Sequence, residues 1–291
     1  MFFGVYTALI TPFKNNKIDF HALDLLLEKQ LINGVQGIVP CGTTGESVTL
    51  EYEEYISILK FCVKKVNKKI KIIAGAGSNC TYKTVHLSKI AEDLGCDGVL
   101  VVSPYYNKPT QKGLYLHFKA INEAINIPII IYNIPSRSSI NIEPKTIAKI
   151  FNDCKNVVGI KESSGSLNQV NDIKLLSHNI VLFSGDDALT LPLLALGGVG
   201  VISVLSNIIP DKIVKLVKFF RMGNINEAMR IHYNLLPLIK VMFLETNPLP
   251  IKTAASILGI CEMEFRLPMC KMEHNNRLYL EKKLREYKLL K

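Results

Sequence analysis

The sequence lacks the cysteine spacings that bind metals or form redox pairs. Its seven cysteines are odd in number, lie scattered along the chain and include no Cys-x-x-Cys pair. They are Cys41, Cys62, Cys80, Cys96, Cys154, Cys261 and Cys270. Unpaired thiols are typical of the reducing cytosol. We therefore expect a cytoplasmic protein whose cysteines have neither a zinc-binding nor a redox role.

Membrane-spanning and export segments are also lacking. The stretch Met1–Tyr6 has no basic region ahead of an apolar core. No part of the chain approaches the roughly 18 uninterrupted apolar residues of a membrane span. We expect a soluble protein that is not exported and has no membrane partner.

The excess of positive charge has no accompanying nucleic-acid motif. The formal net charge is +10, but lysine and arginine are spread along the chain among acidic residues. Even the basic C-terminal run is interrupted by Glu281 and Glu286 at helical spacing, which is typical of a solvated helix face. We expect no nucleic-acid partner. A positive field would instead favour small anionic substrates.

What the sequence does contain is a series of short apolar runs, each followed by a helical pattern. Runs such as Ile127–Ile131 are continuous rather than alternating, which predicts parallel strands covered on both faces. Intervening helices end at Gly34 and Gly95, and another begins near Thr49. The eight predicted strands are Gly4–Ile10, Gly37–Pro40, Lys71–Gly75, Gly98–Val102, Ile127–Tyr132, Val157–Lys161, Ile180–Ser184 and Val199–Ser203.

Eight strands that alternate with helices can form an open doubly wound sheet or a closed barrel. No Gly-x-Gly-x-x-Gly opens the first unit, so the dinucleotide-binding open sheet lacks its fingerprint. We predict an α/β fold, a (β/α)8 TIM barrel over residues 1–224. Residues 225–291 contain only helical patterns and are predicted to form a C-terminal helical domain.

Catalytic side chains of a barrel lie where its strands end, and Lys161 ends the sixth predicted strand. Burial of an ammonium group is costly unless the group is paired or loses its proton. A desolvated lysine amine can attack a carbonyl carbon. Alternatively, Lys161 could extend to solvent or pair with Glu162 or Asp186. The lysine alone leaves both interpretations open.

Other strand ends carry groups that suit the same chemistry. Tyr132 could move a proton, or be a core tyrosine with a satisfied hydroxyl. The turn Gly42–Gly45 offers the hydroxyls and backbone N–H groups of Thr43 and Thr44 to a carboxylate, or is an ordinary tight turn. Arg137 could hold a second carboxylate with two hydrogen bonds, or form a surface salt bridge.

The histidines show no metal-ligand spacing, and none of them ends a predicted strand. They are His21, His86, His117, His178, His232 and His274. A metal-dependent aldolase needs such ligands to polarise its carbonyl substrate. The pattern favours chemistry through an imine on a lysine, with no metal and no added cofactor.

Five motifs together resemble the dihydrodipicolinate synthase family, and the similarity covers essentially the whole chain. They are Gly42–Ser47, Pro104–Asn107, Tyr132–Arg137, Gly159–Glu162 and Ser184–Asp187. The wider group also contains N-acetylneuraminate lyase and keto-deoxy sugar-acid aldolases, which share the first motif, the tyrosine and the lysine. Arg137 and the paired tyrosines Tyr105 and Tyr106 resemble the synthase branch, and the sugar-acid lyases are the alternative.

The resemblance implies a lyase that forms 4-hydroxy-tetrahydrodipicolinate for lysine and diaminopimelate biosynthesis. It implies that Lys161 forms a Schiff base with pyruvate and that Thr44 helps to hold the pyruvate carboxylate. Thr43, Tyr132 and Tyr106 would relay protons, with Tyr106 reaching in from a neighbouring subunit of a homotetramer built as a dimer of dimers.

The resemblance also assigns the remaining residues of the substrate pocket. Arg137 would bind the carboxylate of the second substrate, L-aspartate 4-semialdehyde. Gly185 and Ile202 would line the pyruvate pocket through their backbones. A catalytically inactive protein that senses keto acids is an alternative from another functional class, and the intact Lys161, Tyr132 and Thr43 argue against it.

Feedback-sensitive members of this family bind L-lysine at a second site. The residues that match its positions here are Ser47, Tyr52, Tyr55, Asn79, Lys83 and Tyr105. Histidines and a glutamate are typical where Tyr52, Tyr55 and Lys83 stand. A lysine effector would meet the like charge of Lys83. We therefore predict that inhibition by L-lysine is weak or absent.

Overall fold

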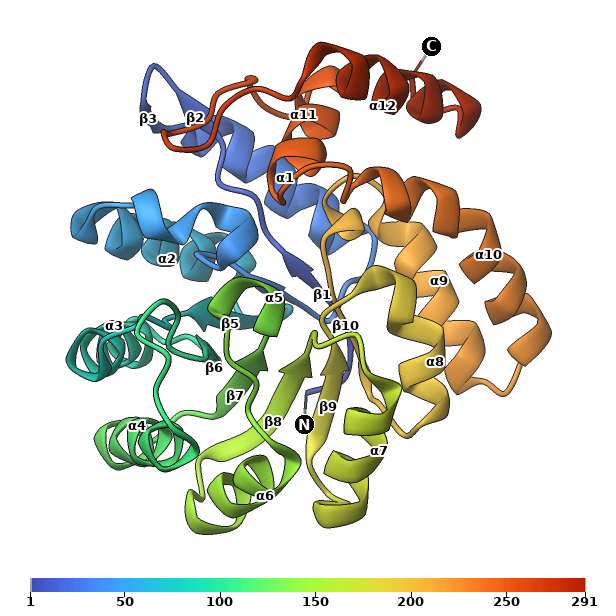
Figure 1. Ribbon diagram of the computed structural model, residues 1–291. Helices are drawn as coiled ribbons and strands as arrows, with labels where there is room; N and C mark the ends of the chain where they lie inside the picture. The colour runs from blue at the N-terminus through green and yellow to red at the C-terminus, as the bar shows by residue number, and fades with distance from the viewer. Residues whose placement is uncertain (1, 291) are drawn as a thin grey trace.

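A computed structural model describes residues 2–290 and contains a closed barrel of parallel strands (Figure 1). Each strand pairs with the next one along the chain, and β1 closes the barrel by pairing with both β4 and β10. The predicted (β/α)8 barrel is confirmed. Its strands are β1 (Gly4–Ala8), β4 (Gly37–Val39), β5 (Lys71–Gly75), β6 (Gly98–Val102), β7 (Ile129–Asn133), β8 (Val157–Glu162), β9 (Val181–Ser184) and β10 (Gly200–Ser203).

Helices surround the barrel, and several begin at a side chain that accepts a hydrogen bond from the first turn. Asp19, Thr110 and Ser166 are such N-caps. The barrel helices are α1 (Phe20–Ile32), α2 (Tyr52–Val66), α3 (Thr81–Asp93), α4 (Gln111–Ala124), α5 (Pro135–Ser138), α6 (Pro144–Asp153), α7 (Leu167–Leu176), α8 (Thr190–Ala195) and α9 (Pro210–Arg221).

Besides shifts of one or two residues at the strand ends, two local features differ from the sequence prediction. Helix α2 begins three residues later than Thr49, because Ser47–Thr49 forms a separate 3₁₀ turn and Glu51 caps the helix in a capping box with Glu54. A small hairpin, β2 (Phe13–Lys14) with β3 (Lys17–Ile18), was not predicted. Strands of two residues are too short to show the alternation by which strands are found.

The helices after the barrel lie on one side of it, coloured orange to red in Figure 1. They are α10 (Ile225–Val241), α11 (Leu249–Ile257) and α12 (His274–Glu286). Helix α10 packs on α9, so the two parts of the chain are in contact. The helical C-terminal part is confirmed, and the boundary at residue 224 stays a prediction. Within residues 2–290, no helix has both the length and the apolar character needed to cross a bilayer.

The barrel interior is filled by large side chains rather than left open. Tyr6, Ile130, Phe183 and Ile202 form one buried cluster, and the Tyr6 and Phe183 rings meet edge to face with centroids 5.3 Å apart. A second, larger cluster lies between the strands and the helices. Because the interior is packed, a substrate can be bound only at an end of the barrel.

The cysteines all stand as free thiols. Burial raises the pKa of Cys41 well above its usual value and that of Cys96 to about 12. A thiol with a raised pKa is rarely ionised at neutral pH, and the thiolate is the reactive form. Both groups therefore behave as small apolar core residues.

Candidate active site

Lys161 and Tyr132 are neighbours on adjacent strands inside the barrel. Their Cα atoms are register partners between β7 and β8, and Lys161 Nζ lies 4.0 Å from the centroid of the Tyr132 ring. Each residue is only 5% exposed. Lys161 therefore does not extend to solvent, and its amine faces a phenol at the carboxyl end of the strands.

The carboxylate beside Lys161 in the sequence is engaged elsewhere. Alternate residues of a strand point to opposite faces, so Glu162 points out of the barrel. Its carboxylate accepts hydrogen bonds from Asn133 Nδ2, Gln169 Nε2 and the backbone N–H of Ser164. Because the two side chains point to opposite faces of the strand, Glu162 does not pair with Lys161.

Gly185 leaves the space that the Lys161 side chain occupies. A Cβ atom at this position would lie 2.8 Å from Lys161 Cε and 1.8 Å from Ser163 Oγ. Only glycine allows this close approach, so a larger residue would displace the lysine.

The buried Asp187 joins the loop after β9 to the end of β10, because its carboxylate accepts hydrogen bonds from Ser203 Oγ and from the backbone N–H of Val204. Burial raises the pKa of Asp187, and these hydrogen bonds oppose that shift.

The loop after β4 brings two threonines to the lysine. Thr43–Gly45 forms a 3₁₀ turn between Cys41 and Glu46, which both adopt left-handed backbone conformations with φ of 55° and 53°. Residues other than glycine rarely do so, and such conformations concentrate at functional sites. Thr43 and Thr44 line a small cavity of about 30 Å³ together with Lys161 and Tyr132.

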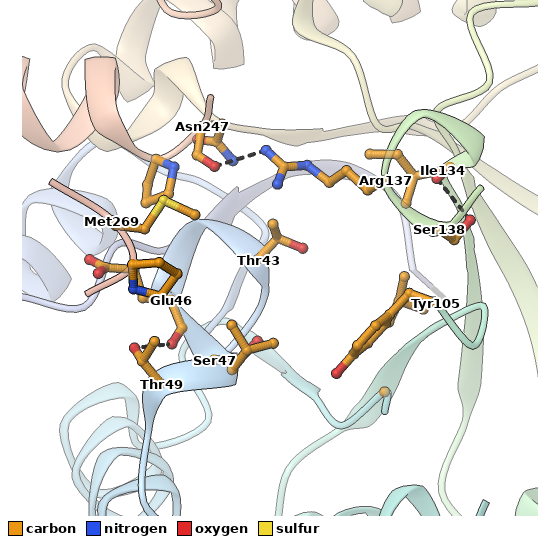
Figure 2. Close-up of a pocket in the computed structure, with 15 residues that line it drawn as sticks. Thr43, Glu46, Ser47, Thr49, Tyr105, Ile134, Arg137, Ser138, Asn247 and Met269 are labelled. Carbon is orange, nitrogen blue, oxygen red and sulfur yellow. Dashed lines mark hydrogen bonds between the residues drawn. The ribbon is translucent and has the colours of Figure 1, made fainter. Parts of the chain in front are cut away.

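A larger cavity of about 190 Å³ lies next to this one and shares Thr43 with it. Figure 2 shows Arg137 extending along its edge toward Asn247. Arg137 Nη2 donates a 2.8 Å hydrogen bond to the backbone oxygen of Asn247. Arg137 is therefore held over a cavity and does not form the surface salt bridge that was its alternative.

The two remaining predicted site residues, Ile202 and Tyr106, are not among those that line the cavity with Lys161. Ile202 is fully buried in the interior cluster that also contains Tyr132, so it forms part of the floor below the site. Tyr106 is 89% exposed and has a left-handed backbone conformation with φ of 72°. Tyr106 lines neither of the two cavities, whereas its neighbour Tyr105 lines the larger one.

Five of the six positions predicted for a lysine effector converge on another cavity, of about 400 Å³. They are Ser47, Tyr52, Tyr55, Lys83 and Tyr105. Asn79 is not among the lining residues, and its backbone oxygen accepts from Asn107 Nδ2. His86, which was not predicted to lie here, also lines this cavity. Its ring stacks on the Tyr52 ring with an interplanar angle of 4° and is hydrogen-bonded to the Tyr52 hydroxyl at 2.9 Å.

The C-terminal part of the chain makes contacts with the threonine loop that were not predicted from the sequence. Asn247 Nδ2 donates to Thr44 Oγ1 at 3.0 Å, and Lys252 Nζ lies 2.6 Å from Glu46 Oε1. These pairs are about 200 residues apart in sequence. The only available signal was Lys252 among mostly apolar neighbours, and it does not identify a partner.

Comparisons with known proteins agree on one family. The model of the dihydrodipicolinate synthetase family matches residues 1–287. A 4-hydroxy-tetrahydrodipicolinate synthase of Endomicrobium trichonymphae is 62% identical over the full length of both chains. One of Methanocaldococcus jannaschii is 47% identical, again over both full lengths.

Solved structures lead to the same result. The crystal structure of dihydrodipicolinate synthase from Aquifex aeolicus has a TM-score of 0.97 and 47% identity, with 99% of each chain covered. That from Thermotoga maritima has a TM-score of 0.97 and 44% identity, with full coverage of both chains. The resemblance carried by the five motifs is thus confirmed, and the chain belongs to the dihydrodipicolinate synthetase family.

Proposed function

We propose that the protein condenses pyruvate with L-aspartate 4-semialdehyde through a Schiff base on Lys161, as a 4-hydroxy-tetrahydrodipicolinate synthase of lysine and diaminopimelate biosynthesis. The observation that carries the proposal is the Lys161 amine, buried against the Tyr132 ring and beside the two threonines. Family membership supports the choice of substrates.

The chemistry begins with attack of the Lys161 amine on the keto carbon of pyruvate, and loss of water leaves an imine. The imine nitrogen withdraws electrons, so the pyruvate methyl group loses a proton and becomes an enamine carbon. That carbon forms a bond to the aldehyde carbon of the second substrate, whose oxygen gains a proton. The amino group of the second substrate then attacks the imine carbon and displaces the Lys161 amine, which closes the product ring and restores the enzyme. Tyr132 and Thr43 lie where they can carry these protons. The reaction needs no added cofactor.

Carboxylate recognition divides between two places. The hydroxyls and N–H groups of Thr43 and Thr44 hold the pyruvate carboxylate beside Lys161. The Arg137 guanidinium over the adjacent cavity binds the carboxylate of the semialdehyde. Two anion-binding groups on adjoining cavities match two substrates that each carry one carboxylate.

The exposed Tyr106 supports assembly into a homotetramer. An aromatic side chain that is 89% exposed, on a backbone held in a left-handed conformation, is accessible to a second subunit. In the proposed assembly, Tyr106 completes the proton relay of its neighbour's site. The free thiols are in keeping with a cytoplasmic location.

Borohydride trapping tests the proposal. Reduction in the presence of pyruvate is expected to attach the three-carbon unit covalently to Lys161, as read by peptide mass mapping. In a parallel assay, pyruvate with aspartate semialdehyde should be consumed, and pyruvate with N-acetylmannosamine should not. An unmodified Lys161 refutes the mechanism, and turnover only with N-acetylmannosamine supports the sugar-acid alternative.

L-lysine is expected not to inhibit the purified enzyme at sub-millimolar concentration. In the 400 Å³ cavity, the Lys83 ammonium would repel a cationic effector, and the Glu51 carboxylate is committed to capping α2. Initial rates with increasing L-lysine measure this. Lys83→Glu removes the repulsion, so it is expected to introduce inhibition. Strong inhibition of the unsubstituted enzyme contradicts the prediction.

A further inference from the structure

Asn247 reaches the candidate active site from the C-terminal part of the chain. It lies just before α11 and is 7% exposed. Its side-chain Nδ2 donates to Thr44 Oγ1 at 3.0 Å, and its backbone oxygen accepts from Arg137 Nη2 at 2.8 Å. Figure 2 shows the end of the Arg137 side chain meeting Asn247, with the loop that carries Thr43 below them. One residue thus touches both of the groups assigned to substrate carboxylates.

The contact with Thr44 determines what the threonine hydroxyl can do. A hydroxyl has a single proton to donate and two lone pairs that accept. Because Asn247 Nδ2 donates to Thr44 Oγ1, one lone pair is occupied and the hydroxyl proton stays available. Thr44 lines the cavity that contains Lys161, so this proton can be donated to an anion bound there.

A second contact from the same segment fixes the other end of the threonine loop. The side chains of Lys252 and Glu46 are 0% and 1% exposed, and their charged atoms are 2.6 Å apart. The backbone N–H of Arg266 donates to the other Glu46 oxygen at 3.3 Å. Glu46 ends the 3₁₀ turn, and its own backbone is in the left-handed conformation. Residues of the C-terminal part therefore hold the threonine loop at two points, the Thr44 hydroxyl and the Glu46 carboxylate.

We infer that Asn247 is a positioning residue for the keto-acid subsite. It sets the Thr44 hydroxyl as a donor to the substrate carboxylate. The inference rests on the proposed function, because it takes Thr44 to bind pyruvate. It gives the C-terminal helical part a role in substrate binding, beyond packing on α9.

Asn247→Ala tests this role while it leaves the backbone oxygen that holds Arg137. The KM for pyruvate is expected to rise by roughly 5- to 30-fold, the effect of losing one buried hydrogen bond. The kcat and the KM for aspartate semialdehyde should stay within about twofold. The pyruvate dependence of borohydride trapping reads the same subsite without the second substrate.

Asn247→Asp tests whether Asn247 acts through its hydrogen bond to Thr44 or only by filling space. Aspartate has the shape of asparagine, but its carboxylate only accepts, so it draws the Thr44 proton away from the substrate. If Asn247 acts by orienting that hydroxyl, Asn247→Asp raises the KM for pyruvate more than Asn247→Ala does. A residue that merely fills space gives the opposite order.

A double-substitution cycle completes the test. In the Thr44→Val background, Asn247→Ala should change the KM for pyruvate by less than about twofold, because the hydroxyl on which it acts is gone. Asn276→Ala is the matched control, since Asn276 Nδ2 donates to Glu245 Oε1 in the C-terminal part, away from the lining residues of these cavities. It should leave both KM values unchanged.

Several results would overturn the inference. They are an unchanged KM for pyruvate in Asn247→Ala, a milder effect of Asn247→Asp than of Asn247→Ala, or additive effects in the cycle. Failure of the proposed function looks different, because the unsubstituted enzyme would then not condense the two substrates at all.

Discussion

Lys161→Met is expected to abolish condensation, with kcat reduced by roughly four orders of magnitude or more, the scale of losing a covalent nucleophile. Methionine keeps most of the length of the side chain and removes a buried amine that lies 4.0 Å from the Tyr132 centroid. The fold should therefore persist. Coupled assays of pyruvate consumption measure the rate, and circular dichroism checks the fold.

Lys174→Met is the matched control for this substitution. Lys174 is a partly exposed lysine of α7 whose Nζ donates to the backbone oxygen of His178. Its loss should leave kcat unchanged. A Lys161→Met protein that turns over within about tenfold of the unsubstituted rate would mean that another group performs the chemistry.

Lys252→Met is expected to destabilise the protein by roughly 3–5 kcal/mol, a large part of the about 5–15 kcal/mol by which folded domains are stable. The substitution leaves the Glu46 carboxylate buried without its ion-pair partner. Burial lowers the pKa of Lys252 and the Glu46 carboxylate opposes this shift, so the two groups depend on one another. The Lys252 ammonium also lies 4.0 Å from the Phe13 ring centroid.

Denaturant unfolding at one fixed protein concentration measures this loss. The double substitution Glu46→Gln with Lys252→Met leaves no buried charge at these two positions and should recover most of the stability. Lys65→Met, which removes the partly exposed pairs with Asp24 and Glu28, should have little effect. If Lys252→Met unfolds at the same denaturant concentration as the unsubstituted protein, the ion pair contributes nothing measurable.

The residues at the strand ends were predictable from the sequence, because a polar side chain at the end of a buried apolar run is a local signal. Lys161 follows Val157–Ile160 and Tyr132 follows Ile129–Ile131, and the barrel rule places both at the same end. That the two side chains are in contact follows only from the pairing register of β7 with β8, which places Tyr132 beside Lys161. No local pattern specifies that register.

Family resemblance identified Gly185 and Ile202 and assigned a substrate to Arg137, and the structure then supplied a physical reason for Arg137 and Gly185. Arg137 is held over a cavity by the backbone of Asn247, and Gly185 leaves space for the Lys161 side chain. The roles of Ile202 and Tyr106 in binding and proton relay stay predictions.

The sequence by itself determined the barrel, the helical C-terminal part, the family and the lysine at the end of the sixth barrel strand. Each of these depends on periodicity or on short motifs, which are local. Only the tertiary structure decided that Asn247 bonds Thr44 and that Lys252 pairs with Glu46. These partners are about 200 residues apart, and buried hydrogen bonds and ion pairs depend on direction and distance. Only the folded chain brings them together.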